Sequence, residues 1–212
     1  MQAILKRRAN GKKVSILSKS LFALLFCITG QSAFSQSITV TTTADVVDGN
    51  TSNIAALAGT PGADGLISLR EAVLATNGEP AGATITITLS AATVILSIPG
   101  TGETATAPNA SIGDLDVLAP ATGTKTVNIV GAGSVNSIIS QTTGTDRIFD
   151  VHPNSTPGGG NITFSISGAR LTGGVASAPV SGGALLAGRP NDAIIIADCL
   201  FNLNTASSNG GA

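Results

Sequence analysis

Apolar and polar residues alternate in short runs along most of the chain after residue 36, and glycine-containing turns separate the runs. Alternation with a period of two is the pattern of a β-strand with one buried face, and Thr, Val and Ile favour strands. The clearest runs are Ala83–Leu89 (ATITITL) and Thr93–Ile98 (TVILSI). Further strands are predicted at Ser37–Ala44, Thr126–Val130, Val135–Ser140, Arg147–Val151, Ile162–Ile166 and Ala193–Ala197.

One segment, Asp64–Asn77 (DGLISLREAVLATN), has the pattern of a helix instead. Ser68 and Glu71 have the spacing of a capping box, and Gly78 follows as a stop at the C′ position. The preceding residues, Asp45–Gly65, are rich in Asp, Asn, Gly and Ala and are predicted to form a loop. A single short helix ahead of many strands predicts a cap over the open end of a sheet or solenoid.

The last part of the chain contains a loose repeat. Gly182-Gly183-Ala184 returns as Gly210-Gly211-Ala212. A second pattern, Ile-x-Gly-x-x-Leu-x-x-Gly, runs from Ile166 to Gly174. It returns thirty residues later, from Ile196 to Asn204, as Ile-x-Asp-x-x-Phe-x-x-Asn. Repeats of this length are typical of solenoids. An isolated β-sandwich is the alternative architecture.

The N-terminus has the three parts of a secretory signal. Basic residues are concentrated in the first nineteen positions, an apolar run follows at Leu21–Gly30, and Ala33-Phe34-Ser35 supplies small residues for cleavage before Gln36. We therefore expect residues 1–35 to be a signal peptide, with an uncleaved anchor as the alternative. The apolar run is shorter than the roughly 20 residues of a membrane span, so no transmembrane span is expected.

Composition narrows the class of protein. A mean hydropathy of +0.38 excludes the charged, disordered class. Without residues 1–35 the chain keeps five basic and twelve acidic residues, so no nucleic-acid partner is expected. Cys199 is then the only cysteine, which rules out an intrachain disulfide and leaves packing and hydrogen bonds as the source of stability.

The segment Ile67-Ser68-Leu69-Arg70-Glu71-Ala72 resembles the CSLREA box near the N-terminus of exported bacterial right-handed parallel β-helix proteins, with Ile67 at the cysteine position. The flanking TVTTTADVVDG and the later GDLDV at Gly113–Val117 are similar to the same family. The tail, with Phe201-x-x-Asn204 and then Gly-Gly-Ala, resembles polymorphic outer-membrane-protein repeats. Together these similarities span about residues 38–212.

The resemblance implies an all-β fold, a right-handed parallel β-helix (solenoid) with a short N-terminal capping helix. Residues 36–110 would form the cap region with the first strands, and residues 111–212 the β-helix rungs. The implied function is that of a secreted or cell-surface, non-catalytic, adhesin-like scaffold, with host or surface glycans or proteins as partners. Because the chain stops inside a repeat, we interpret it as an N-terminal fragment whose own C-terminal region is a further partner. The alternative is a polysaccharide lyase or glycoside hydrolase on the same fold, with its site outside this fragment.

Candidate chemistry is sparse, and no catalytic or cofactor-binding residue is predicted. Asp114 and Asp116 lie on one side of an extended segment and are the candidate Ca²⁺ ligands, although a solvated turn is the favoured interpretation. Asp150 and His152 would share a strand face, where a carboxylate could orient the only histidine as a general base. No nucleophile or metal set accompanies them, so solvent-facing polarity is the favoured interpretation there too.

Overall fold

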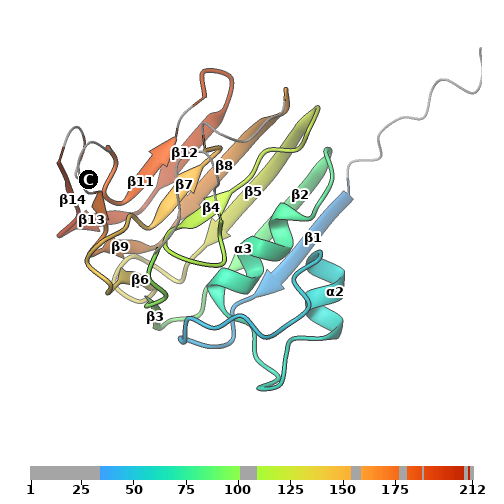
Figure 1. Cartoon of the computed structure of the whole chain (residues 1–212), viewed down its shortest axis with the longest axis horizontal. Coiled ribbons are helices and arrows are strands. Elements are labelled where there is room, and N and C mark those ends of the chain that lie inside the picture. Colours follow the sequence, from blue (N-terminus) through green and yellow to red (C-terminus); the bar gives the residue numbers. More distant parts are fainter. Residues whose placement is uncertain are drawn as a thin grey trace, which may run out of the picture. The chain divides into compact units, whose positions relative to one another are not determined.

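The computed structural model describes residues 34–100, 109–153, 159–176, 181–187, 189–207 and 210. All of them belong to one compact unit, Ala33–Ala212, which is mostly β with two helices (Figure 1). The predicted signal peptide lies outside the described residues except for Phe34 and Ser35, which belong to the first strand. No helix of the described part is long and apolar enough to cross a membrane.

The described strands form four sheets, and every strand pair is parallel. The first sheet has the order β1 (Phe34–Thr39), β2 (Ala83–Thr88), β5 (Thr124–Val130), β8 (Asn161–Ser167) and β12 (Ala193–Ala197). The second has the order β3 (Thr93–Leu96), β6 (Ile138–Gln141), β9 (Arg170–Thr172) and β13 (Leu200–Asn202). The third contains β4 (Leu115–Val117), β7 (Phe149–Val151) and β11 (Leu185–Ala187), and the fourth β10 (Val175–Ala176) and β14 (Thr205–Ala206).

The chain visits these sheets in a fixed order. From β2 it enters the first, second and third sheets in turn, and it repeats this circuit from β5. From β8 it follows the same path but passes through β10 of the fourth sheet before it reaches the third. Each returning strand pairs in parallel with the strand of the previous circuit (Figure 1). A β-sandwich is built from antiparallel sheets, so the sandwich alternative does not fit these pairings.

The repeat in the tail corresponds to structural register. Ile196 pairs with Ile166 and Phe201 pairs with Leu171, each thirty positions earlier. Gly168 and Asp198, at the same repeat position, both have left-handed backbone, with φ of 61° and 52°. The repeat therefore marks equivalent positions in successive circuits.

The core is formed by the apolar members of the alternating strands. The inward side chains of β2, β5 and β8 are buried, and they include Ile85, Ile129 and Ile166. At the edge of the same sheet, β12 is mostly exposed, and 47% of Ile196 is accessible. The rings of Phe149 and Phe164 form a tilted pair with centroids 5.6 Å apart. This ring contact stabilises the core beyond the burial of the two side chains. Alternation in the sequence therefore predicted the buried face correctly.

The predicted helix is α3 (Leu69–Asn77), and its capping box is present: the Ser68 side chain accepts from Glu71 N, and Glu71 accepts from Ser68 N. The helix ends before Gly78 as predicted, but Gly78 is the C-cap with right-handed backbone (φ −77°) and not a left-handed C′ residue. A Cβ on Gly78 would lie 1.9 Å from the carbonyl oxygen of Ser52. Glycine is required there by close backbone approach and not by a left-handed turn.

The prediction of a loop at Asp45–Gly65 was also wrong in part, because it contains a second helix, α2 (Ile54–Gly59). Asn53 caps this helix by accepting a hydrogen bond from Ala56 N, and Ile54 and Leu57 are buried. Six residues are too few for a detectable helical period. The helix is stabilised by its buried contacts.

Candidate functional site

The residues that resemble the CSLREA box have structural roles in this chain. Ser68 through Ala72 are all buried, with at most 1% of each residue exposed. Ser68 caps α3, while Leu69 and Ala72 belong to the hydrophobic core. Ile67, at the position of the family's cysteine, packs against the same core.

Arg70 is the largest buried side chain of this segment. It makes a two-point ion pair with Asp45, with Nε–Oδ1 at 2.6 Å and Nη2–Oδ2 at 3.0 Å. Its guanidinium also donates to the carbonyl oxygens of Ala110, Gly113 and Asp114. Both partners of the ion pair have fully buried side chains. This one arginine therefore joins the helix to the loop before it and to the segment leading into β4.

Two further buried charges fasten the helix. Glu71 Oε1 accepts from the backbone nitrogens of Asp48 and Gly49, at 2.9 and 2.8 Å. Lys125, on the inward face of β5, donates to Thr76 O near the end of α3 at 2.9 Å. Burial lowers the pKa of Lys125 to about 8, partly offset by the negative charge of Glu79. A cation at the C-terminal turn of a helix is favourable, so Lys125 stabilises the helix end while itself being desolvated.

The favoured interpretation of Asp114 and Asp116 as a solvated turn was wrong, because both are buried, with 3% and 2% exposed. The Asp114 carboxylate lies 3.0 Å from Arg147 Nε, and Arg147 also donates to Asp150 at 2.9 Å. Asp116 on β4 stands opposite Asp150 on β7. The segment is thus a buried polar cluster in which an arginine already neutralises part of the carboxylate charge.

Asp146 adjoins this cluster. Its carboxylate accepts from Arg147 N at 2.9 Å. Burial raises its pKa above the usual value, and hydrogen bonding together with the nearby arginines opposes that rise. Among the described residues, no group of three or more His, Cys, Asp or Glu side chains is arranged to hold a metal ion. The Ca²⁺ role of Asp114 and Asp116 stays a prediction.

The favoured interpretation of His152 as solvent-facing was wrong, because the residue is buried, and its alternative pairing with Asp150 was wrong as well. His152 has left-handed backbone (φ 56°) directly after β7 ends at Val151, so strand alternation no longer describes its direction. Its ring is buried, and Nδ1 lies 2.7 Å from Oδ2 of Asp192, forty positions later. The other Asp192 oxygen accepts from Ile162 N.

This His–Asp pair has the arrangement that orients a general base, but a base must also reach the proton of a substrate. Only 2% of His152 is exposed, and Nε2 is buried without a hydrogen-bond partner in the described part of the chain. Asp192 also holds a backbone nitrogen of β8. The pair therefore ties the turn after β7 to the residue before β12 and, through Asp192, to β8.

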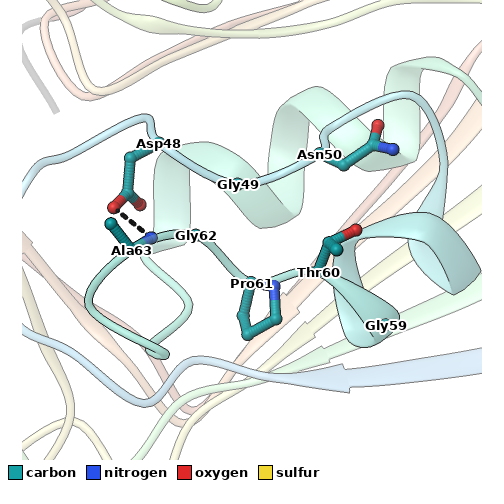
Figure 2. Close-up of a pocket in the computed structure, with 8 residues that line it drawn as sticks. All are labelled: Asp48, Gly49, Asn50, Gly59, Thr60, Pro61, Gly62 and Ala63. Atoms are coloured by element: carbon teal, nitrogen blue, oxygen red, sulfur yellow. Dashed lines mark hydrogen bonds between the residues drawn. The ribbon is translucent and has the colours of Figure 1, made fainter.

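A shallow hollow of about 620 Å³ lies between the residue 48–50 segment and the residue 59–63 segment (Figure 2). Figure 2 shows the Asp48 side chain turned toward Ala63, whose backbone nitrogen donates to it at 2.9 Å. Backbone groups and glycines form most of the lining, with Asn50 and Thr60 as its other polar side chains. Since its only charged group is already hydrogen-bonded, the hollow presents no reactive group.

Three residues of the tail contact the core or the previous circuit. Asn204 bonds the previous circuit, accepting from Gly174 N and donating to Leu171 O, and Phe201 packs against the core. Cys199 is partly buried against the core, with Sγ near the carbonyl oxygens of Ile166 and Ala197. None of the three faces a candidate ligand site.

Sequence reasoning missed Asp45, Lys125 and Asp192 as partners in these networks. Lys125 carried a usable signal, because it occupies an inward position of an alternating strand. Asp45 and Asp192 carried none, since their partners lie 25 and 40 positions away. Comparison with models of protein families, with curated proteins and with solved structures finds no match to this chain.

Proposed function

We propose that this chain is an exported right-handed parallel β-helix, with α3 closing its first turn, and that it serves as a non-catalytic, adhesin-like scaffold at the cell surface or outside the cell. The supporting observation is the repeated circuit through parallel sheets, in which each circuit pairs in register with the one before it, the last pair at a thirty-residue interval. Each circuit of a solenoid buries its apolar face only against its neighbours, as the inward side chains do here.

The closed end supports the scaffold interpretation. An uncovered first circuit would expose apolar side chains and unpaired backbone groups to other chains. Here α3 buries seven of its nine residues, Arg70 fastens it to the segment leading into β4, and Lys125 fastens it to β5. A solenoid whose first circuit is covered does not associate with other chains at that end, as an elongated scaffold requires.

The state of the polar clusters supports a non-catalytic role. Arg147 is engaged by Asp114 and Asp150, and His152 is enclosed with Asp192. An enzyme site needs polar groups that converge on an accessible cavity. The hollow between residues 48 and 63 has no such groups.

The second candidate function is a polysaccharide lyase or hydrolase, favoured only by the in-register carboxylates Asp116 and Asp150 beside Arg147. The test is incubation of the purified chain with pectin, alginate and chondroitin, with and without Ca²⁺. We expect neither unsaturated products absorbing in the ultraviolet nor new reducing ends. Either signal, if lost in Asp116→Asn and retained in the exposed control Asp64→Asn, would establish the enzyme instead.

The adhesin-like role is tested by attachment. Beads coated with the purified chain should adhere to immobilised surface glycans or proteins more than beads coated with heat-unfolded chain do. Equal attachment of both bead types across the panel would refute the role.

A further inference from the structure

The outward face of the first sheet carries a regular grid of hydroxyl groups. In β2 the inward residues are Ala83, Ile85 and Ile87, and the outward residues are threonines. Thr86 stands next to Ser37 of β1 on one side and Asn128 of β5 on the other. Asn128 is followed by Ser165 of β8, whose hydroxyl donates to it at 2.6 Å. One row of short polar side chains thus crosses four strands, which lie side by side in the first sheet (Figure 1).

Parallel rows lie on both sides of this one. Thr84 is in register with Thr126, and Thr126 with Thr163. Thr88 stands between Thr39 and Val130 in the third row. On β2, β5 and β8 the outward positions carry hydroxyls except at Asn128, Val130 and Asn161, and none is charged.

The spacing of the grid is fixed by the backbone. Parallel strands lie about 4.8 Å apart, and alternate residues on one face follow each other at about 6.6 Å along a strand. Threonine is β-branched and therefore stiff at χ1, so its hydroxyl and methyl groups are held in place before any partner arrives. Preorganisation of this kind reduces the entropy lost on binding.

The chemistry of the face excludes most classes of partner. A phosphate-rich or acidic partner needs Lys or Arg, and a cationic partner needs Asp or Glu, but the outward positions have neither. Sugar recognition generally uses flat aromatic rings, and no outward position of these strands carries one. What fits is an uncharged solid surface that repeats in two dimensions and offers hydrogen-bond donors and acceptors at fixed intervals.

We propose that this threonine grid, defined by the outward residues of β1, β2, β5 and β8, binds the surface of ice. The grid matches ice in being uncharged, periodic in two directions and able both to donate and to accept hydrogen bonds, while its methyl groups disfavour liquid water. The inference goes beyond the scaffold function and does not depend on export or adhesion.

The test is an ice-recrystallisation assay on the purified chain, in which a thin film of small crystals is held just below the melting point and grain growth is followed. Wild-type chain should suppress grain growth and enter a slowly growing ice hemisphere. Thr86→Lys, at the centre of the grid, should abolish both effects. Thr172→Lys is the matched control, because Thr172 is a half-buried outward threonine of β9 in the second sheet and should keep both.

Circular dichroism and melting curves establish that each variant is folded. If Thr86→Lys does not fold, Thr86→Val retains the β-branched shape without the hydroxyl and should weaken the suppression. Grain growth unaffected by wild-type chain would overturn the proposal. So would equal activity in Thr86→Lys and Thr172→Lys. Co-sedimentation with crystalline cellulose or chitin, without any effect on ice, would assign the grid to a neutral polysaccharide instead.

Discussion

Replacement of Arg70 by methionine should be among the most damaging single changes in this chain. The substitution keeps much of the side-chain volume but removes the guanidinium from a site where the side chains of both Arg70 and Asp45 are fully buried. Asp45 would keep its two backbone donors, Ser97 N and Ile98 N, and lose the one counter-charge that pairs with it among the described residues. Three backbone carbonyl oxygens would lose a donor as well.

The magnitude follows from that geometry. Removing one partner of a buried ion pair costs about 3–5 kcal/mol, because it leaves an uncompensated buried charge. A domain of this kind is stable by roughly 5–15 kcal/mol in total. We therefore expect Arg70→Met to lose about 3–5 kcal/mol of unfolding free energy, a large part of the whole.

Urea denaturation followed by circular dichroism measures this loss. The control Arg170→Met removes an arginine whose Nε has no hydrogen-bond partner among the described residues, and it should change stability by no more than about 1 kcal/mol. The double variant Asp45→Asn, Arg70→Met removes both charges and should recover part of the loss. A cost below about 1 kcal/mol for Arg70→Met, or full additivity in the double variant, would refute the reasoning.

Three further predictions concern the helix, the buried lysine and the N-terminus. Leu69→Asp places a charge in the core at α3, so it should lower the unfolding free energy by several kcal/mol and cause aggregation that light scattering detects. Leu66→Asp, at a position that is 40% exposed, should do neither. Identical melting curves for the two variants would contradict the role of the helix as a cap. Because the pKa of Lys125 is lowered to about 8, the unfolded chain holds a proton between pH 8 and 10.5 that the folded chain has released. Unfolding free energy should therefore rise with pH in this window by at most about 1.4 kcal/mol per pH unit, and Lys125→Met should remove the rise; an unchanged slope in that variant would count against the assignment. N-terminal sequencing of secreted chain should give Gln36, and an intact Met1 on the extracellular protein would defeat the signal-peptide prediction.

The predicted cleavage has a structural consequence. Phe34 and Ser35 begin β1 and pair with Ala83 and Thr84, so cleavage before Gln36 would shorten the first strand by its first two residues. The remaining pairs, from Gln36 to Thr39, would keep β1 in the sheet. Gln36 also donates to Glu79 at 2.9 Å, which helps hold the new terminus in place.

The helix and the buried strand faces that surround the candidate site were predictable, because the residues that specify them are close together in the sequence. The capping box needs only Ser68 and Glu71 three positions apart. The inward apolar side chains follow from alternation, and the thirty-residue repeat marked the register of the last circuits. Burial of Asp114 was not predictable in this way, because a charged residue is favoured at the surface until a specific partner is known.

The sequence by itself determined the strand-rich class, the buried face of each strong strand and the position of the capped helix, since these depend on periods of two to four residues. The tertiary structure decided which strands pair, that His152 meets Asp192, that Arg147 meets Asp114, and that Asn53 starts a second helix. These contacts join positions up to 52 and 53 residues apart, as where Asp45 holds Ser97 and Ile98. Their formation depends on which circuits stack and on the burial that stacking creates, and no local pattern encodes either of these.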